Sequence, residues 1–158
     1  MHSIDMEHLK RCVELAEQAL NKGDEPFGSV LVDAQGKVCF EDHNHVAGGD
    51  ATQHPEFAIA RWAAEHMTPD ERADATVYTS GEHCPMCAAA HGWVGLGRIV
   101  YASSSRQLGE WLEELGVANG PVAPLPITAI VPNAQVEGPA PALAEQIRDL
   151  HRRLHSGS

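Results

Sequence analysis

The sequence predicts an α/β domain with three layers, in which helices cover both faces of a β-sheet. Short segments rich in β-branched and aromatic residues alternate with longer segments whose apolar residues recur at helical spacing. Chains with this alternation bury a sheet between two layers of helices. A length of 158 residues suits one hydrophobic core better than two, so residues 1–158 are predicted to form a single domain.

The first half of the chain is predicted to contain two helices and three strands. Apolar residues from Met6 to Leu20 repeat at helical spacing and stop before Gly23, which indicates a helix. A hairpin, a second helix and a third strand follow. Their predicted ranges are 29–33 and 37–41 for the hairpin strands, 54–67 for the helix and 76–79 for the strand.

The second half continues the alternation and then becomes less regular. A helix over 84–94, a strand over 98–102 and a helix over 107–115 are predicted from spacing and from Gly116. Three prolines make 120–126 a loop, and the β-branched run 127–131 is predicted to be a fifth strand. An amphipathic helix over 142–154 and an unstructured tail over 156–158 complete the predicted elements.

The clearest chemical signal combines His54-Pro55-Glu56 with Cys84-Pro85-Met86-Cys87. His54, Cys84 and Cys87 are predicted metal ligands, with Zn²⁺ as the cofactor. Structural zinc normally takes four protein ligands, whereas catalytic zinc takes three and keeps one position for water. Three ligands with a nearby carboxylate therefore predict a catalytic site in which Glu56 is the catalytic residue.

Both halves of this motif are expected at the start of a helix. Pro55 and Pro85 each precede an apolar segment at helical spacing, and proline is tolerated at the first helical position. The partial positive charge at a helix N-terminus lowers thiol pKa values, which favours the thiolates that a metal requires.

Two other interpretations of these residues remain open. The two cysteines could form a redox pair of the thioredoxin type, which leaves His54 and Glu56 without a role. They could instead belong to a closed structural zinc site in which His83 or His91 is the fourth ligand. His91 shares a helical face with both cysteines, and His83 is adjacent to Cys84.

The H-x-E and P-C-x-x-C pair is the pattern of zinc deaminases that act on nucleobases. Three further segments extend the likeness: Pro-Phe-Gly-Ser-Val-Leu-Val over 26–32, His-Asn-His-Val over 43–46 and Gly-Arg-Ile-Val-Tyr-Ala over 97–102. With Thr-Ser-Gly-Glu-His before the cysteines, the chain resembles the cytidine deaminase superfamily and most closely its guanine deaminase-like branch. The resemblance implies a mixed five-stranded sheet and a homodimer.

The resemblance also implies residues that contact the substrate. Phe27 would stack on the substrate ring, Asn44 would bind the ring edge, and Trp93 would be a pocket aromatic. Packing is an equal alternative for Phe27 and Trp93, and a turn is the alternative for Asn44.

A second acidic group is implied near Glu113 or Glu114, although the apolar helical face through Leu108 and Leu112 would turn both toward solvent. His83 and His91 are candidates for contact with the substrate or the ligands.

Two departures from the branch concern the pocket. His83 stands where the family usually has proline. No aromatic residue follows Trp111, whereas similar guanine deaminases use an aromatic near the chain end to cover a partner's substrate. Deamination is therefore a firmer expectation than guanine itself.

Charge restricts the predicted partners. The formal net charge is −11, with 11 Lys plus Arg against 22 Asp plus Glu, and aromatic residues make up 5% of the chain. Nucleic-acid binding depends on basic grooves and stacked aromatics, so no nucleic-acid partner is predicted. No membrane span or signal peptide is predicted, and the cysteine content fits the cytoplasm. The expected partners are water and a small heterocyclic amine.

Together these observations predict a zinc-dependent hydrolytic deaminase that releases ammonia from a free nucleobase or related amino-heterocycle. The expected substrate is guanine or an s-triazine such as ammeline. Cytosine or cytidine deamination is the alternative within the same chemistry. A zinc-stabilised binding domain without catalysis is the alternative from another class.

Overall fold

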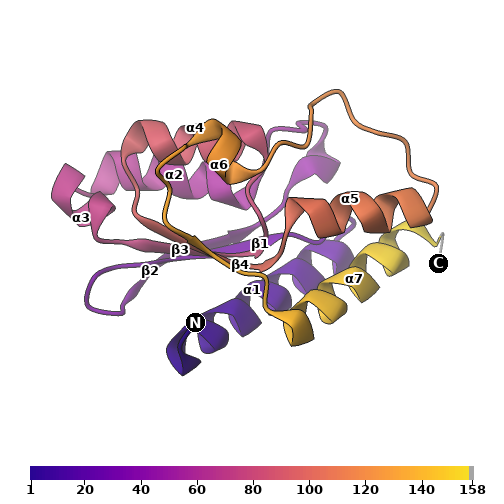
Figure 1. Cartoon of the computed structure of the whole chain (residues 1–158), viewed down its shortest axis with the longest axis horizontal. Helices are drawn as coiled ribbons and strands as arrows, with labels where there is room; N and C mark the ends of the chain where they lie inside the picture. Colours follow the sequence, from indigo (N-terminus) through magenta and orange to yellow (C-terminus); the bar gives the residue numbers. More distant parts are fainter. Residues whose placement is uncertain (157–158) are drawn as a thin grey trace.

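A mixed five-stranded sheet lies between two layers of helices (Figure 1), as described for residues 1–156 by a computed structural model. The strand order is β2-β1-β3-β4-β5. The β1 strand pairs antiparallel with β2 and β3, whereas β4 pairs parallel with β3 and with β5. The strands are β1 (Gly28–Val32), β2 (Val38–His43), β3 (Thr76–Gly81), β4 (Arg98–Ser103) and β5 (Val136–Glu137). The predicted three-layer α/β fold with a mixed sheet is confirmed.

Two long helices cover one face of the sheet and two helices that begin at the predicted ligands cover the other (Figure 1). The first pair is α1 (Ser3–Asn21) and α7 (Pro141–His155), and the second pair is α2 (Pro55–His66) and α4 (Pro85–Val94). The shorter helices are η1 (Val46–Gly48), α3 (Pro69–Ala73), α5 (Ser105–Glu114) and α6 (Ile127–Ile130). No helix within residues 1–156 combines the length and apolar character needed to cross a membrane.

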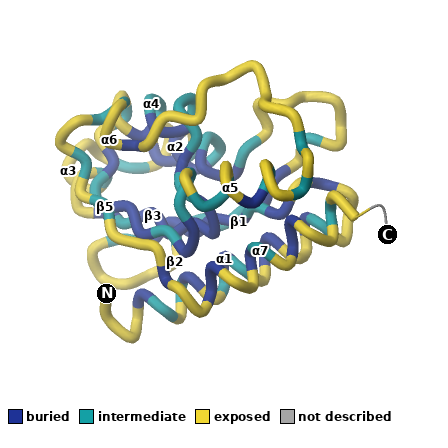
Figure 2. Tube along the Cα trace, turned by 45° about the vertical axis from the view of Figure 1, so that its right-hand side comes forward, coloured by how far each residue is buried: buried dark blue, intermediate teal, exposed yellow. Residues whose placement is uncertain are grey.

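The core is divided by the sheet into two apolar layers. Val30 and Val32 pack with residues of α1 and α7, whereas Leu31 between them packs with residues of α2. Alternate residues of a strand point to opposite faces, so a strand covered on both sides is apolar throughout. All five residues of β1 are buried, and the buried positions in Figure 2 follow the sheet and the inner sides of the helices.

The predicted strand over 127–131 is wrong. Residues Ile127–Ile130 form the single turn of α6, and the fifth strand is Val136–Glu137, which pairs with β4. Ile127 is 1% exposed and packs with Ala88 and Ile99, while its backbone N–H donates to Oε2 of Glu82 at 2.9 Å. Burial and this carboxylate outweigh the β preference of the sequence, which depends strongly on context.

The other predicted helices and strands are present, with ends that differ by a few residues. Gly23 follows α1 with a φ of +89°, as expected for a residue that ends a helix. The predicted tail begins at Ser156, which ends α7, and its last two positions, 157–158, lie outside the described residues.

Candidate active site

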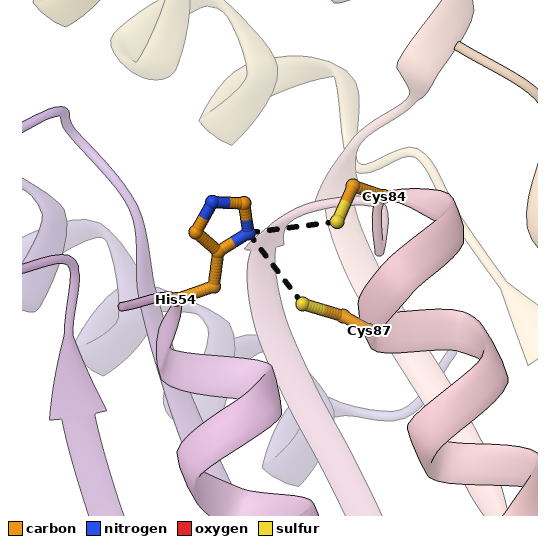
Figure 3. Close-up of side chains that lie close together, drawn as sticks. All are labelled: His54, Cys84 and Cys87. Atoms are coloured by element: carbon orange, nitrogen blue, oxygen red, sulfur yellow. Dashed lines mark hydrogen bonds between the residues drawn. The ribbon is translucent and has the colours of Figure 1, made fainter. Parts of the chain in front are cut away.

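Three ligand atoms come together where α2 and α4 begin (Figure 3). Nδ1 of His54 lies 3.5 Å from Sγ of Cys84 and 3.5 Å from Sγ of Cys87, and all three atoms lie within 4.8 Å of one another. A tetrahedral zinc ion with ordinary bond lengths separates a nitrogen and a sulfur ligand by about 3.6 Å. The three side chains therefore fit the zinc ion predicted from the sequence.

The two helix starts fix these ligands because His54 and Cys84 are the residues immediately before the first helical turn. Pro55 and Pro85 occupy the first helical positions, where a missing N–H has no cost. Cys87 lies in the first turn of α4, so a C-x-x-C spacing directs both sulfurs to the same point.

The electrostatics of the site favour a thiolate. Hydrogen bonds from Cys87 and His54 lower the pKa of Cys84 to about 4, against the opposing effect of burial. The pKa of Cys87 is raised, first because Cys84 carries the charge of the pair and then because of burial. Contact with Cys84 raises the pKa of His54. A metal cation would favour both thiolates.

Glu56 is a buried carboxylate beside this cluster, with 6% of its surface exposed. Its Oε1 lies 2.9 Å from Oγ of Ser29 and 2.8 Å from Oγ1 of Thr79, which belong to paired positions of β1 and β3. Burial raises the pKa of Glu56, and the hydrogen bonds of Thr79 and Ser29 oppose that rise. A carboxyl group in such surroundings is suited to accept and release a proton.

A cavity of about 440 Å³ opens onto His54, Cys84 and Glu56. Phe27 lines it from the start of β1, Leu108 and Leu112 line it from α5, and residues 117–120 and 122–124 complete its wall. No lysine or arginine is among the lining residues, all of which lie in the described part of the chain. The volume of the cavity is in the range of small-molecule sites. Most of its lining residues are apolar, and its two carboxylates belong to Glu56 and Glu82.

His83, which precedes Cys84, and His91, on α4, form a buried pair. Their ring centroids are 5.4 Å apart in an edge-to-face arrangement, and burial lowers the pKa of both rings. Nε2 of His91 lies 2.8 Å from the backbone oxygen of Gly97. Within residues 1–156, neither histidine belongs to the group of atoms that could hold a metal with His54.

The other predicted contacts are placed differently. Asn44 is 1% exposed and adjoins Phe27, whose backbone oxygen accepts from its N–H at 3.0 Å, but Asn44 does not line the cavity. Trp93 is 89% exposed because its side of α4 faces away from the sheet. Glu113 and Glu114 lie on the polar side of α5 and are exposed, and Glu114 forms an ion pair with Arg148. The chain does not bring these three side chains to its own cavity.

Sequence reasoning missed Glu82, which lines the cavity two residues before Cys84. Its Oε1 accepts from the N–H of Ser105 at 3.0 Å and its Oε2 from that of Ile127 at 2.9 Å, so it joins the starts of α5 and α6. A carboxylate two residues from a ligand, as in His54-Pro55-Glu56, was the available signal. The hydroxyls of Ser29 and Thr79 had no such signal, because only strand pairing brings them to Glu56.

The family described as the cytidine and deoxycytidylate deaminase zinc-binding region matches residues 2–103. The chain belongs to this family. The matched segment contains the three candidate zinc ligands and Glu56, and it ends before α5. The predicted membership of the cytidine deaminase superfamily is confirmed.

Two relatives show how far the similarity in sequence extends. A probable cytosine deaminase from Schizosaccharomyces pombe is 33% identical over 104 residues, which are 66% of this chain and 63% of that protein. Guanine deaminase from Bacillus subtilis is 36% identical over 104 residues, which are 65% of this chain and 66% of that protein. The chain thus spans a little less than two thirds of the length of both relatives.

Similarity in structure extends further along the chain. The structure of guanine deaminase from Nitrosomonas europaea matches with a TM-score of 0.72 and 21% identity, over 94% of this chain and 83% of that one. The deaminase fold therefore includes the C-terminal part of the chain, beyond the segment that the family matches.

Proposed function

We propose that this chain is a zinc-dependent hydrolytic deaminase of a free amino-heterocycle. The observation that carries the proposal is that the buried carboxylate of Glu56 lines one cavity with His54 and Cys84, two members of the ligand group that Cys87 completes. Three protein ligands leave a coordination position for water, and membership of the zinc-binding deaminase family supports the same chemistry.

Zinc, when bound, lowers the pKa of its water from 15.7 to about 7. Glu56 would take the proton of the attacking water and deliver it to the ring nitrogen beside the amino-bearing carbon. The carboxylate of Glu56 would then take the proton of the newly added hydroxyl group and pass it to the departing amine, so that a carbonyl forms and ammonia leaves. Two hydroxyls, of Ser29 and Thr79, hold one oxygen of Glu56 during both transfers.

The residues that line the cavity favour a small uncharged substrate. Phosphate sites in proteins commonly use arginine or lysine side chains, and the lining includes neither. Phe27 and the apolar residues of α5 suit a planar ring. We therefore infer a free base rather than a nucleotide or nucleic acid, with guanine or an s-triazine such as ammeline as the expected substrate.

Cytosine or cytidine is the second candidate substrate. The similarity to the probable cytosine deaminase favours it, and the residues that line the cavity do not by themselves separate one neutral ring from another. Discrimination would depend on hydrogen bonds to the exocyclic groups of the ring.

Ammonia release by the zinc-loaded protein tests the proposal, with guanine, cytosine, cytidine, adenine, isocytosine and amino-s-triazines as substrates. We expect turnover of one ring class. Glu56→Gln should retain zinc and lower turnover by about 10²- to 10⁴-fold, because it keeps the shape of the side chain and removes the proton carrier. Glu65→Gln, on the exposed side of the same helix, is the matched control and should turn over normally.

Each proposed element has an outcome that would overturn it. Unchanged turnover in Glu56→Gln would exclude Glu56 as proton carrier. If the zinc-loaded protein released ammonia from none of these substrates, the alternative of a zinc-stabilised binding domain without catalysis would be favoured. That alternative is weakened by the structure of the site, because His83 and His91 do not complete a fourth position within residues 1–156.

We also infer a cytoplasmic homodimer in which Trp93 lies at the contact between copies. Trp93 is the most exposed of the large apolar side chains in residues 1–156, and an exposed aromatic is typical of an interface. All four cysteines are free, which fits a reducing compartment. Light scattering should show a dimer that Trp93→Ser weakens; an unchanged mass in the variant would exclude this surface.

A further inference from the structure

A second group of metal-ligating side chains lies outside the catalytic cavity. Asp24 belongs to the connection between α1 and β1, His43 ends β2, and His45 directly precedes η1. One ligand atom from each lies within 4.8 Å of the other two. Asp24 and His43 are buried, with 7% and 6% of their surfaces exposed, whereas His45 is exposed. The group is therefore open to solvent on the side of His45.

Both imidazoles are held so that one nitrogen of each remains available to a metal. Nδ1 of His43 lies 2.8 Å from the backbone oxygen of Asn44, which can only accept, so this nitrogen carries the hydrogen and Nε2 carries the lone pair. Nε2 of His45 lies 2.8 Å from Oδ1 of Asp42, so Nδ1 has the lone pair when the ring is neutral. Histidine ligands of metals are oriented by such bonds to a carbonyl or carboxylate.

The carboxylate of Asp24 adds a third ligand and a negative charge. Its Oδ1 accepts from the N–H of Ala47 at 2.9 Å, and its Oδ2 has no hydrogen-bond partner within residues 1–156. Oδ2 is not one of the buried side-chain atoms without a partner in residues 1–156, so it reaches solvent and is accessible to a cation.

A cation already contacts the group. Nζ of Lys22 lies 3.1 Å from Nε2 of His43, on the nitrogen that carries the lone pair, and it has no other partner within residues 1–156. The ammonium therefore lies in the place that a metal bound to Nε2 would take. The four-carbon stem of lysine is flexible, so Lys22 can withdraw, but its charge would weaken the binding of a metal.

We propose that Asp24, His43 and His45 form a second site for a divalent transition metal, separate from the site of His54, Cys84 and Cys87. Two imidazoles and one carboxylate suit Zn²⁺ and similar ions and leave positions for water. The site contains no thiolate, so its affinity for zinc is below that of the first site, and Lys22 lowers it further.

Because the second site lies close to Phe27, a metal bound there would affect the backbone beside the cavity. Asn44 lies between His43 and His45, and its backbone N–H donates to the oxygen of Phe27, which lines the cavity. A metal bound to Asp24, His43 and His45 would join the segment before β1 to the segment after β2. It would thereby hold Asn44 and the backbone of Phe27 in place.

The test is the number of Zn²⁺ ions bound to the full chain, measured by equilibrium dialysis in zinc buffers and elemental analysis. We expect a strongly bound ion and a second, weaker ion in the wild type. His45→Ala removes an exposed ring without disturbing the core, and it should weaken only the second ion, by at least about 100-fold. His66→Ala, another exposed histidine, is the matched control and should retain both ions.

Lys22→Met tests the same site in the opposite direction. Loss of the ammonium charge should tighten the second ion by about tenfold or more. Co²⁺ separates the two sites further, because only the first has thiolates and gives sulfur-to-cobalt charge-transfer absorption. A variant with both Cys84→Ser and Cys87→Ser should lose that band and still bind the second ion.

A single bound ion in both the wild type and Lys22→Met would overturn the proposal. A second ion that His45→Ala leaves unchanged would overturn it as well. Neither result depends on turnover, so the deaminase proposal can stand or fall separately.

Discussion

Two hydroxyl groups from neighbouring strands hold the carboxylate of Glu56. Ser29 and Thr79 are paired positions of β1 and β3, both are fully buried, and their oxygens lie 2.8 Å apart. Thr79 also lies 2.9 Å from the backbone oxygen of Gly81. The hydroxyl of Thr79 therefore contacts three polar groups. Because the site is buried, solvent water would not replace the hydroxyl as their hydrogen-bond partner.

We expect Thr79→Val to keep the shape of this side chain and to leave those neighbours with one partner fewer. A buried polar group without a partner costs about 1–3 kcal/mol, so the free energy of unfolding should fall by that amount. Turnover should fall about tenfold or more because Glu56 loses a contact that orients it, while bound zinc is unchanged. Urea unfolding, ammonia release and elemental analysis measure the three quantities.

Thr76→Val is the control for this prediction. Thr76 begins β3, is partly exposed and forms no side-chain hydrogen bond within residues 1–156. Equal losses in the two variants would show that the hydroxyl of Thr79 has no special part.

At the scale of residues, sequence reasoning identified the candidate ligands because each is set by a local pattern. His54 and Cys84 both precede a proline at a helix start, and Cys87 follows Cys84 by one helical turn. Ser29 and Thr79 reach Glu56 only through the register of β1 and β3, which spacing along the chain does not contain.

At the scale of elements, the helix α1 lies directly against the start of β1. A Cβ atom on Gly28 would lie 2.4 Å from Cβ of Leu15 and 2.6 Å from the backbone oxygen of Cys12. The absence of a side chain at Gly28 thus allows the helix and the strand to approach closely, next to Phe27 at the cavity.

We expect Gly28→Ala to destabilise the protein by about 1–3 kcal/mol, because the extra methyl group must displace backbone atoms of α1. The same substitution at Gly48 should be nearly neutral, since nothing lies within 4 Å of a Cβ atom there. Urea unfolding of the two variants gives the comparison, and a Gly28→Ala variant as stable as the wild type would contradict the packing described.

The periodicity of the sequence predicts the helices and the central strands correctly, but it does not predict the helical turn of α6. A β-branched run such as 127–131 has no intrinsic reason to form a helical turn. The turn is stabilised by the buried contacts of Ile127 and by the carboxylate of Glu82, which is 45 residues distant in sequence. Elements determined by such remote partners are beyond local pattern reasoning.

At the scale of the whole molecule, α7 joins the C-terminal part of the chain to α1, β4 and α5. His151 lies on its inner side, 3% exposed, with ring centroids 5.3 Å from Phe27 and 6.3 Å from Trp111. Burial, and then the charge of His155, lower the pKa of His151 to about 4. The folded protein therefore keeps this ring neutral at a pH where an unfolded chain would protonate it.

This difference makes the stability of the fold sensitive to acid. In the unfolded chain the pKa of histidine is about 6.5, so above that pH neither state binds a proton at His151 and the contribution to stability is complete. As the pH falls from about 6.5 to about 4, the unfolded state gains a proton that the folded state refuses, and stability declines. Below about 4 both states bind the proton and the decline ends.

We expect the wild type to lose about 2 kcal/mol more than His151→Leu between about pH 7 and about pH 5. Carboxylates that titrate in this range act equally in both proteins, so the difference isolates the histidine. Urea unfolding at the two pH values measures it, and the exposed His66→Leu should follow the wild type. Parallel pH profiles for the wild type and His151→Leu would contradict this prediction. They would mean that the ring is protonated in the folded state despite its enclosure between Phe27 and Trp111.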